Sequence, residues 1–355
     1  MKTSDVAAVH GLTGVRAVLK GTLAGKALAA LRRRRHAPVR ALRAERAARR
    51  DRRHGQTATV PAAARTTYRA LYLVPAGPGS WPALSDTIES ILHWEGNEAK
   101  VVVIDDATVD CRAAVVQRRF PDVEVLRRRW PSGGPPRIFP MLAWGIRELL
   151  RRYNFEVICK LDTDALVTGP GLGARAAEAL SAGDRVGMIG TVGLRADGVP
   201  EDYTYDRWAL SHSERWSPSV RRLAERARAG GYTGEKVHGG ACFFSRRGLE
   251  AADRAGLLVW RPPWWSILTD ELCFALALYA SGSGLASFGA PGEPTVSGQA
   301  FLPLDKEDVP RAGKLAVHSV RRGTRGESEQ ELRAYFRRLR GGDRRGAAAI
   351  PTSRR

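Results

Sequence analysis

Runs of apolar residues alternate with amphipathic stretches from residue 68 onward. The first run, 70–75, is stopped by Pro75 and a Gly-Pro-Gly sequence, and apolar residues then recur at helical spacing through 84–92. The next run, 101–104, has no polar alternation, which is typical of a strand covered on both faces. This order predicts a strand, a helix and a second strand parallel to the first.

The same alternation continues along the chain and predicts an α/β fold. Helices are expected at 82–94, 111–120 and 137–153, and strands at 123–126, 157–167 and 186–192. Such an order is typical of a mainly parallel central sheet flanked by helices, with right-handed crossovers. The polar and aromatic segment 195–235 departs from the pattern and is interpreted as an insertion that contains one helix near 217–229.

Two pairs of carboxylates follow predicted strands. Asp105 and Asp106 end one strand, and Asp162 and Asp164 lie within 157–167. The carboxyl ends of parallel strands are where an open α/β sheet binds its ligands, and oxygen ligands suit Mg²⁺ or Mn²⁺ together with substrate phosphates. The alternative is structural, because such residues also cap backbone amides in turns and at helix starts.

The formal net charge of +20 is concentrated at the two ends of the chain. Residues 1–67 hold 16 Lys/Arg against 3 Asp/Glu and residues 321–355 hold 11 against 4, so residues 68–320 are neutral. A neutral core argues against a dedicated nucleic-acid-binding domain. We therefore expect a basic Ala/Arg-rich extension at 1–67, partly helical or disordered, one folded domain at 68–320 and a basic tail at 321–355. The extension is either a solvated segment, which its weak apolar face favours, or a helix at an anionic membrane.

The cysteines and the absence of long apolar stretches bear on the cellular compartment. No pair of the 4 cysteines has zinc-finger or Cys-x-x-Cys spacing, which suits a reducing cytosol. The sequence shows neither a secretory signal nor an 18-residue apolar stretch. These features predict a cytoplasmic protein, with peripheral contact at the inner face of the membrane as the alternative role for the basic ends.

The ordered series of motifs resembles the GT-A fold glycosyltransferases, nearest to the large family 2. The resemblance covers residues 68–320 and rests on the order and spacing of several short motifs, each of them degenerate alone. They are Leu-Val-Pro at 73–75, Val-Ile-Asp-Asp at 103–106, Ser-Gly-Gly at 132–134 with the helix through 146, Leu-Asp-Thr-Asp at 161–164, His-Gly-Gly-Ala-Cys-Phe-Phe at 238–244 and Thr-Asp-Glu-Leu at 269–272.

The resemblance implies a nucleotide-sugar donor and Mn²⁺ or Mg²⁺. Asp164 is the expected direct metal ligand, Asp162 contacts ribose or a metal-bound water, and His318 completes the metal site. The donor-binding residues that it implies are Pro75, Asp105, Asp106, Arg137, Asp162, Gly239 and Gly240. Structural alternatives are a surface arginine at 137, a β-bulge at the glycine pair and a structural histidine at 318. The doubled proline at 135–136 departs from the family pattern.

The carboxylates Asp270 and Glu271 begin an apolar helix, where an inverting transferase would hold its general base. The family usually shows Glu-Asp, whereas this chain has Asp-Glu, so both residues stay candidates and the helix-cap position favours Asp270. The alternative is that both only complement the helix dipole. Trp264 and Trp265 precede this helix and offer aromatic faces to an acceptor, or else belong to the core.

The expected function is transfer of a glycosyl group from a nucleotide-sugar to an acceptor hydroxyl, with inversion. The acceptor is a glycan, a lipid-linked molecule or a small molecule, and no specific nucleic acid is expected. A retaining GT-A enzyme is the first alternative. A sugar-phosphate nucleotidylyltransferase ranks lower, because Gly77-Pro-Gly-Ser-Trp81 lacks a basic residue for a phosphate loop. A non-enzymatic binder of anionic polymers fits the basic ends but not the acidic motifs of the neutral core.

Overall fold

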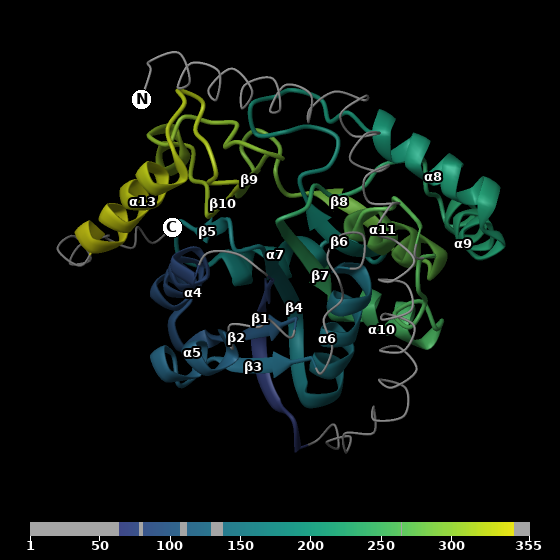
Figure 1. Cartoon of the computed structure of the whole chain (residues 1–355), viewed down its shortest axis with the longest axis horizontal. Coiled ribbons are helices and arrows are strands. Elements are labelled where there is room, and N and C mark those ends of the chain that lie inside the picture. Colours follow the sequence, from purple (N-terminus) through teal and green to yellow (C-terminus); the bar gives the residue numbers. More distant parts are fainter. Residues whose placement is uncertain (1–63, 78–80, 107–111, 129–137, 264, 344–355) are drawn as a thin grey trace, which may run out of the picture.

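A seven-stranded sheet forms the centre of the computed structural model, which describes residues 64–77, 81–106, 112–128, 138–263 and 265–343 (Figure 1). The strands of this sheet are β1 (Thr66–Ala76), β2 (Ala99–Asp105), β3 (Glu124–Arg127), β4 (Tyr153–Leu161), β6 (Val186–Gly190), β7 (Ala241–Ser245) and β8 (Gly284–Ser287). The longer helices are α4 (Trp81–Glu95), α5 (Arg112–Arg119), α6 (Ile138–Arg152), α7 (Leu172–Ser181), α8 (Thr204–Trp216), α9 (Pro218–Ala229), α10 (Arg246–Arg254), α11 (Asp270–Ala280) and α13 (Glu329–Asp343).

The strand order is β3-β2-β1-β4-β7-β6-β8. All neighbouring pairs are parallel except those of β7, which runs antiparallel to both β4 and β6. The α/β fold class predicted from the sequence is therefore confirmed: a mainly parallel central sheet flanked by helices. The carboxyl ends of β1, β2 and β4 meet at one edge, which is the edge where such sheets bind ligands.

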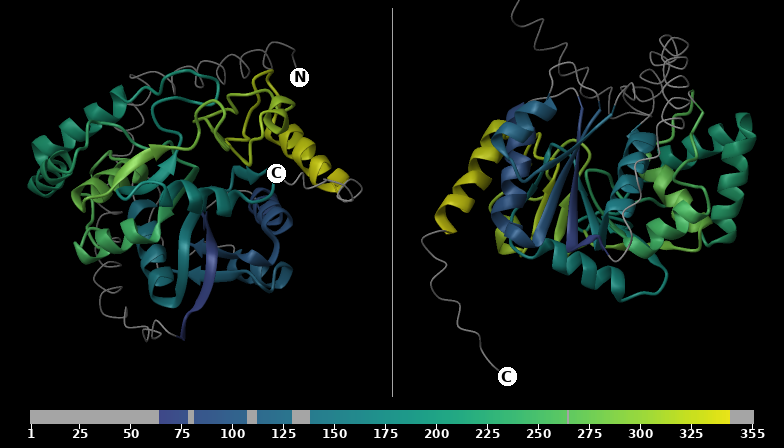
Figure 2. Two further views of the ribbon diagram at one scale, coloured as in Figure 1. Left: turned by 180° about the vertical axis from the view of Figure 1, so that it is seen from behind. Right: turned by 90° about the horizontal axis from the view of Figure 1, so that it is seen from below.

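Helices cover both faces of the sheet (Figure 2). Leu71 and Leu73 of β1 face the side covered by α6, α9, α10 and α11, whereas Tyr72 and Val74 face the side covered by α4, α5 and α7. Successive side chains of a strand point to opposite faces, so an unbroken apolar run is what a sheet with two covered faces requires. The two clusters anchor the strand ends that carry the polar residues.

The predicted strand at 157–167 is in fact two strands in two sheets. β4 ends at Leu161, a turn closed by the bond from Ala165 N to Asp162 O (2.9 Å) follows, and β5 (Ala165–Val167) joins a small sheet with β9 (Thr295–Ser297) and β10 (Ala316–His318). In this small sheet Ala165 pairs with His318. Because β10 pairs with β5, the turn brings His318 close to the two aspartates that follow β4. Helix α8, which the sequence pattern did not indicate, lies within the segment interpreted as an insertion.

The C-terminal helix α13 packs against the domain. Its Leu332 and Phe336 are buried in a cluster with Leu166 of β5 and Val317 of β10. The packed core therefore extends past residue 320, beyond the boundary that the charge distribution suggested. None of the helices in the described ranges combines the length and the apolar character needed to span a bilayer.

Candidate active site

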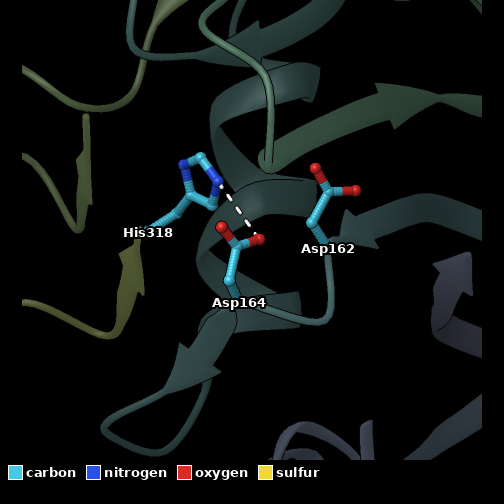
Figure 3. Close-up of side chains that lie close together, drawn as sticks. All are labelled: Asp162, Asp164 and His318. Atoms are coloured by element: carbon cyan, nitrogen blue, oxygen red, sulfur yellow. Dashed lines mark ion pairs between the residues drawn. The ribbon is translucent and has the colours of Figure 1, made fainter. Parts of the chain in front are cut away.

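Asp162, Asp164 and His318 form a cluster at the carboxyl end of β4 (Figure 3). One oxygen or nitrogen atom of each lies within 4.8 Å of those of the other two. The two aspartates come from the turn between β4 and β5, and the histidine ends β10. Asp164 and His318 are buried, while the Asp162 side chain is 34% exposed. The cluster therefore has one open side.

Asp164 is held as a carboxylate by three neighbours. Ser319 donates to its Oδ2 at 2.9 Å, the Arg321 Nε lies 2.7 Å from the same oxygen, and His318 Nε2 lies 3.5 Å from Oδ1. Burial alone would raise the pKa of Asp164, but His318, Arg321 and Ser319 together lower this pKa well below its usual range. Asp164 therefore stays ionised, and an ionised carboxylate can bind a cation.

The ring of His318 is oriented by Ser297. The Ser297 hydroxyl donates to the carbonyl of Gly239 at 3.2 Å and lies 3.0 Å from His318 Nδ1. Because a hydroxyl has one hydrogen, a donating Ser297 accepts from Nδ1–H, and Nε2 is the ring nitrogen left for another partner. That nitrogen is the one that faces Asp164, so the histidine presents the atom that a metal would need.

Lys160 connects the cluster of Asp162, Asp164 and His318 with the second acidic pair, Asp270 and Glu271. Its side chain is 2% exposed, and its Nζ lies 2.8 Å from Asp162 Oδ1. Burial opposes the charge on Lys160, but the carboxylates of Asp162, Asp270 and Glu271 raise its pKa well above the usual value. A protonated lysine at this place offsets part of the negative charge of these three carboxylates.

Asp270 and Glu271 occupy the first turn of α11, where the Thr269 hydroxyl caps the helix by accepting from Leu272 N. Glu271 Oε2 lies 3.8 Å from Lys236 Nζ. Burial would raise the pKa of Glu271, but Lys236 and then Lys160 hold it below its usual range. Burial, followed by the charge of Glu271, raises the pKa of Asp270. The two carboxylates therefore differ in their readiness to accept a proton.

The glycine pair just before β7 lies between the Asp162, Asp164 and His318 cluster and the carboxylate pair of α11. A Cβ on Gly239 would overlap Glu271 Oε1, and a Cβ on Gly240 would overlap the ring of His318. Gly240 also has a φ of +95°, which side chains rarely adopt. The Gly240 carbonyl accepts from Asp162 N at 2.8 Å. This loop thus sets the spacing between the two acidic groups.

The remaining predicted residues are less closely joined to this cluster. Pro75 lies near the end of β1 and pairs with Ile104 of β2. Asp105 is fully buried, accepts from Ala113 N at 3.4 Å and lies 3.6 Å from Arg127 Nε, as the helix-capping alternative implies. Asp106 forms an ion pair with Arg128 at 3.1 Å. Trp265 is half-buried in the segment before α11, and Arg137 and Trp264 lie outside the described residues.

Five polar residues of the site were not selected from the sequence: Lys160, Lys236, Ser297, Ser319 and Arg321. Lys160 carried a readable signal, because a single charge inside an otherwise apolar strand requires a buried partner. The other four come from loops or short strands, where the pattern of apolar residues indicates no direction for a side chain.

Two solved structures are similar to this chain at low sequence identity. The mannosyltransferase PcManGT from Pyrobaculum calidifontis, solved in complex with GDP-Man and Mn²⁺, is similar over 73% of this chain and 65% of its own, with 19% identity and a TM-score of 0.39. Residues 1–349 of TarS from S. aureus are similar over 63% of this chain and 60% of that chain, with 15% identity and a TM-score of 0.37. The chain thus spans less than two thirds of either structure. No protein-family model and no curated protein sequence matches this chain.

Proposed function

We propose that the protein is a divalent-metal-dependent glycosyltransferase that moves a sugar from a nucleoside diphosphate sugar to an acceptor hydroxyl, with inversion. The observation that carries this proposal is the cluster of Asp162, Asp164 and His318 next to the carboxylates of α11, at the binding edge of a mainly parallel sheet. One group suits the diphosphate that leaves, and the other suits removal of a proton from the acceptor.

The residues of the cluster fit a divalent ion. Asp162 and Asp164 offer oxygen atoms and His318 offers Nε2, all within 4.8 Å of one another. A set with one imidazole suits Mn²⁺ better than Mg²⁺, which prefers oxygen ligands only. The bound ion would neutralise charge on the diphosphate.

Arg321 is suited to hold the leaving diphosphate. Its side chain is 63% exposed, while its Nε lies 2.7 Å from Asp164. The rest of the guanidinium fork can therefore turn to phosphate oxygens, which an arginine binds with two parallel hydrogen bonds. Lys160 has a different role in this proposal, because it is buried and holds Asp162 in place.

Asp270 is the better candidate for the general base. Glu271 is kept ionised by Lys236, and an ionised carboxylate of low pKa is a weak base. The pKa of Asp270 is raised toward neutral pH, and a general base works best when its pKa lies near the working pH. The resulting mechanism is direct attack by the acceptor oxygen on the anomeric carbon, as Asp270 takes its proton and the diphosphate departs.

A thermal-shift panel tests the proposed function. UDP, GDP, CDP, ADP and the corresponding triphosphates would each be added to the full chain with and without Mn²⁺. A ligand that binds the native state stabilises it by about 2.7 kcal/mol at 100 times its Kd. We expect one diphosphate to raise the melting temperature only when Mn²⁺ is present. A response to triphosphates alone would favour nucleotidyl transfer, and no response to any nucleotide would contradict the proposal.

A further inference from the structure

Helix α13 sends one buried side chain to the turn that carries Asp162 and Asp164. Arg333, whose side chain is 5% exposed, donates from Nη2 to the carbonyl of Thr163 at 2.6 Å. Thr163 is the residue between the two aspartates. Residues 170 positions apart in the sequence are therefore joined by a hydrogen bond at the turn between the two aspartates, and α13 lies alongside α4 (Figures 1 and 2).

Asp86 of α4 anchors this arginine. Its Oδ2 lies 3.0 Å from Arg333 Nη1, and its Oδ1 accepts from the buried Arg340. Arg337, which is 55% exposed, lies 3.6 Å from Oδ1. A buried arginine is costly unless its charge and its donors are satisfied. Asp86 supplies the charge, and Glu329 and the carbonyl of Ala83 accept the remaining donors that face them.

The Thr163 carbonyl is held from two sides. Besides Arg333, the Thr87 hydroxyl of α4 lies 3.1 Å from the same oxygen and 2.8 Å from the carbonyl of Ala165. Fixing the peptide of Thr163 fixes the direction in which the flanking residues leave the backbone. A metal site depends on such outer contacts, since they orient the ligands before the ion binds.

From these contacts we propose that Arg333 is a positioning residue for the metal loop, with Asp86 as its anchor. Arg333 touches neither carboxylate of the cluster and acts only through the backbone of Thr163. The inference rests on the proposed function, because it assumes that Asp162 and Asp164 bind a divalent ion. It also gives α13 a role in the site, beyond packing against β5 and β10.

Arg340 offers a matched control. Like Arg333 it is a nearly buried arginine of α13, 8% exposed, that binds Asp86, but it makes no contact with Thr163 among the described residues. Arg333→Met and Arg340→Met therefore remove the same charge from the same aspartate. Only the first removes the hydrogen bond to the metal loop.

The test is a titration of the full chain with Mn²⁺, in which electron paramagnetic resonance measures the concentration of the unbound ion. The temperature is one at which circular dichroism shows that each variant is folded. Loss of an outer-shell partner weakens metal affinity by roughly 10- to 100-fold. We expect a loss of that size in Arg333→Met and less than threefold in Arg340→Met, with partial recovery in Arg333→Lys. Equal affinities in wild type and Arg333→Met, or equal losses in both methionine variants, would overturn the positioning role.

Two further outcomes are informative. Wild-type protein without saturable Mn²⁺ binding would contradict the proposed function and this inference together, whereas the outcomes above contradict the inference alone. If Arg333→Met does not fold, Arg333→Lys and Thr87→Val provide the test, because each keeps the charge next to Asp86 and weakens the hold on the Thr163 carbonyl. Unchanged Mn²⁺ affinity in both of these variants would overturn the inference.

Discussion

At the residue scale, the surroundings of α11 give the adjacent carboxylates Asp270 and Glu271 different pKa values. Lys236 lies on the side of Glu271, and the pKa of Glu271 is lowered, whereas burial and the charge of Glu271 raise the pKa of Asp270. Although the two carboxylates are adjacent, their surroundings therefore make them chemically different. The difference in pKa supports Asp270 as the proposed base.

This difference predicts the pH dependence of two variants. The base acts without its proton, so kcat/KM should rise with pH through the pKa of Asp270, which is raised above the usual value of about 3.9. Asp270→Asn should lower kcat by roughly 10²–10⁴-fold. Glu271→Gln removes a charge that raises this pKa, so it should keep turnover and shift the acid limb to lower pH. Steady-state kinetics from pH 4 to 9 measure both effects.

The opposite pattern would contradict this assignment. If Glu271→Gln lost turnover while Asp270→Asn kept it, Glu271 would be the base. If both variants kept turnover, neither carboxylate would be the base, and the anomeric configuration of the product, read by proton NMR, should then be retained.

The sequence revealed some site residues better than others for a physical reason. The four acidic residues of the site lie at the ends of apolar elements, so the pattern of apolar residues indicates where they are. They are Asp162, Asp164, Asp270 and Glu271. The partners of a charged residue depend on tertiary packing, which the pattern does not contain. Lys236, for example, lies 35 positions before Glu271 and outside any regular element.

At the element scale, the pattern predicted most strands and helices but not the break between β4 and β5. Both strands are buried, so the apolar run is interrupted only by the turn that carries the aspartates. One long buried strand and two short buried strands joined by a turn give the same pattern of apolar residues. The antiparallel direction of β7 was likewise hidden, since direction follows from connections and not from apolar periodicity.

The glycine loop before β7 gives a prediction at this scale. Gly240→Ala should lower stability and weaken Mn²⁺ binding, because the new Cβ would overlap His318 and the φ of +95° is strained for alanine. Gly256→Ala is the control: its φ is +74°, but no atom lies within 4 Å of the added Cβ. We expect the control to lose about 1–2 kcal/mol of stability from strain and to bind Mn²⁺ normally. Chemical denaturation and Mn²⁺ titration measure the two effects.

A normal Mn²⁺ affinity in Gly240→Ala would contradict this role of the loop. The same measurement would show that His318 can move from Gly240 without loss of the site.

At the scale of the whole molecule, the two basic ends differ. Residues 329–343 form α13, whose Leu332 and Phe336 are buried and whose Arg333 reaches the metal loop. The charge count alone could not show this, because arginines that bind Asp86 and arginines in solvent contribute equally to net charge. Of the predicted N-terminal extension 1–67, residues 1–63 lie outside the described residues, and the role of the extension stays a prediction.

Deletion of residues 1–60 tests that role. β1 begins at Thr66 and the core clusters are built from described residues that the deletion keeps, so we expect the shortened chain to fold and bind nucleotide as the full chain does. Sedimentation with vesicles that contain phosphatidylglycerol should show weaker binding than for the full chain, and added salt should weaken binding of the full chain by screening. Equal binding by both chains would show that the extension does not contact membranes, and a shortened chain that cannot fold would place it inside the domain.

The central claim is that Asp164 binds a metal on which donor binding depends. Isothermal titration calorimetry would measure the Kd of the responding nucleoside diphosphate for wild type and Asp164→Asn, each with and without Mn²⁺. We predict that Mn²⁺ strengthens binding to wild type by at least about tenfold, equivalent to 1.4 kcal/mol, and has no effect on the folded variant. Equal strengthening by Mn²⁺ in both proteins would contradict the account.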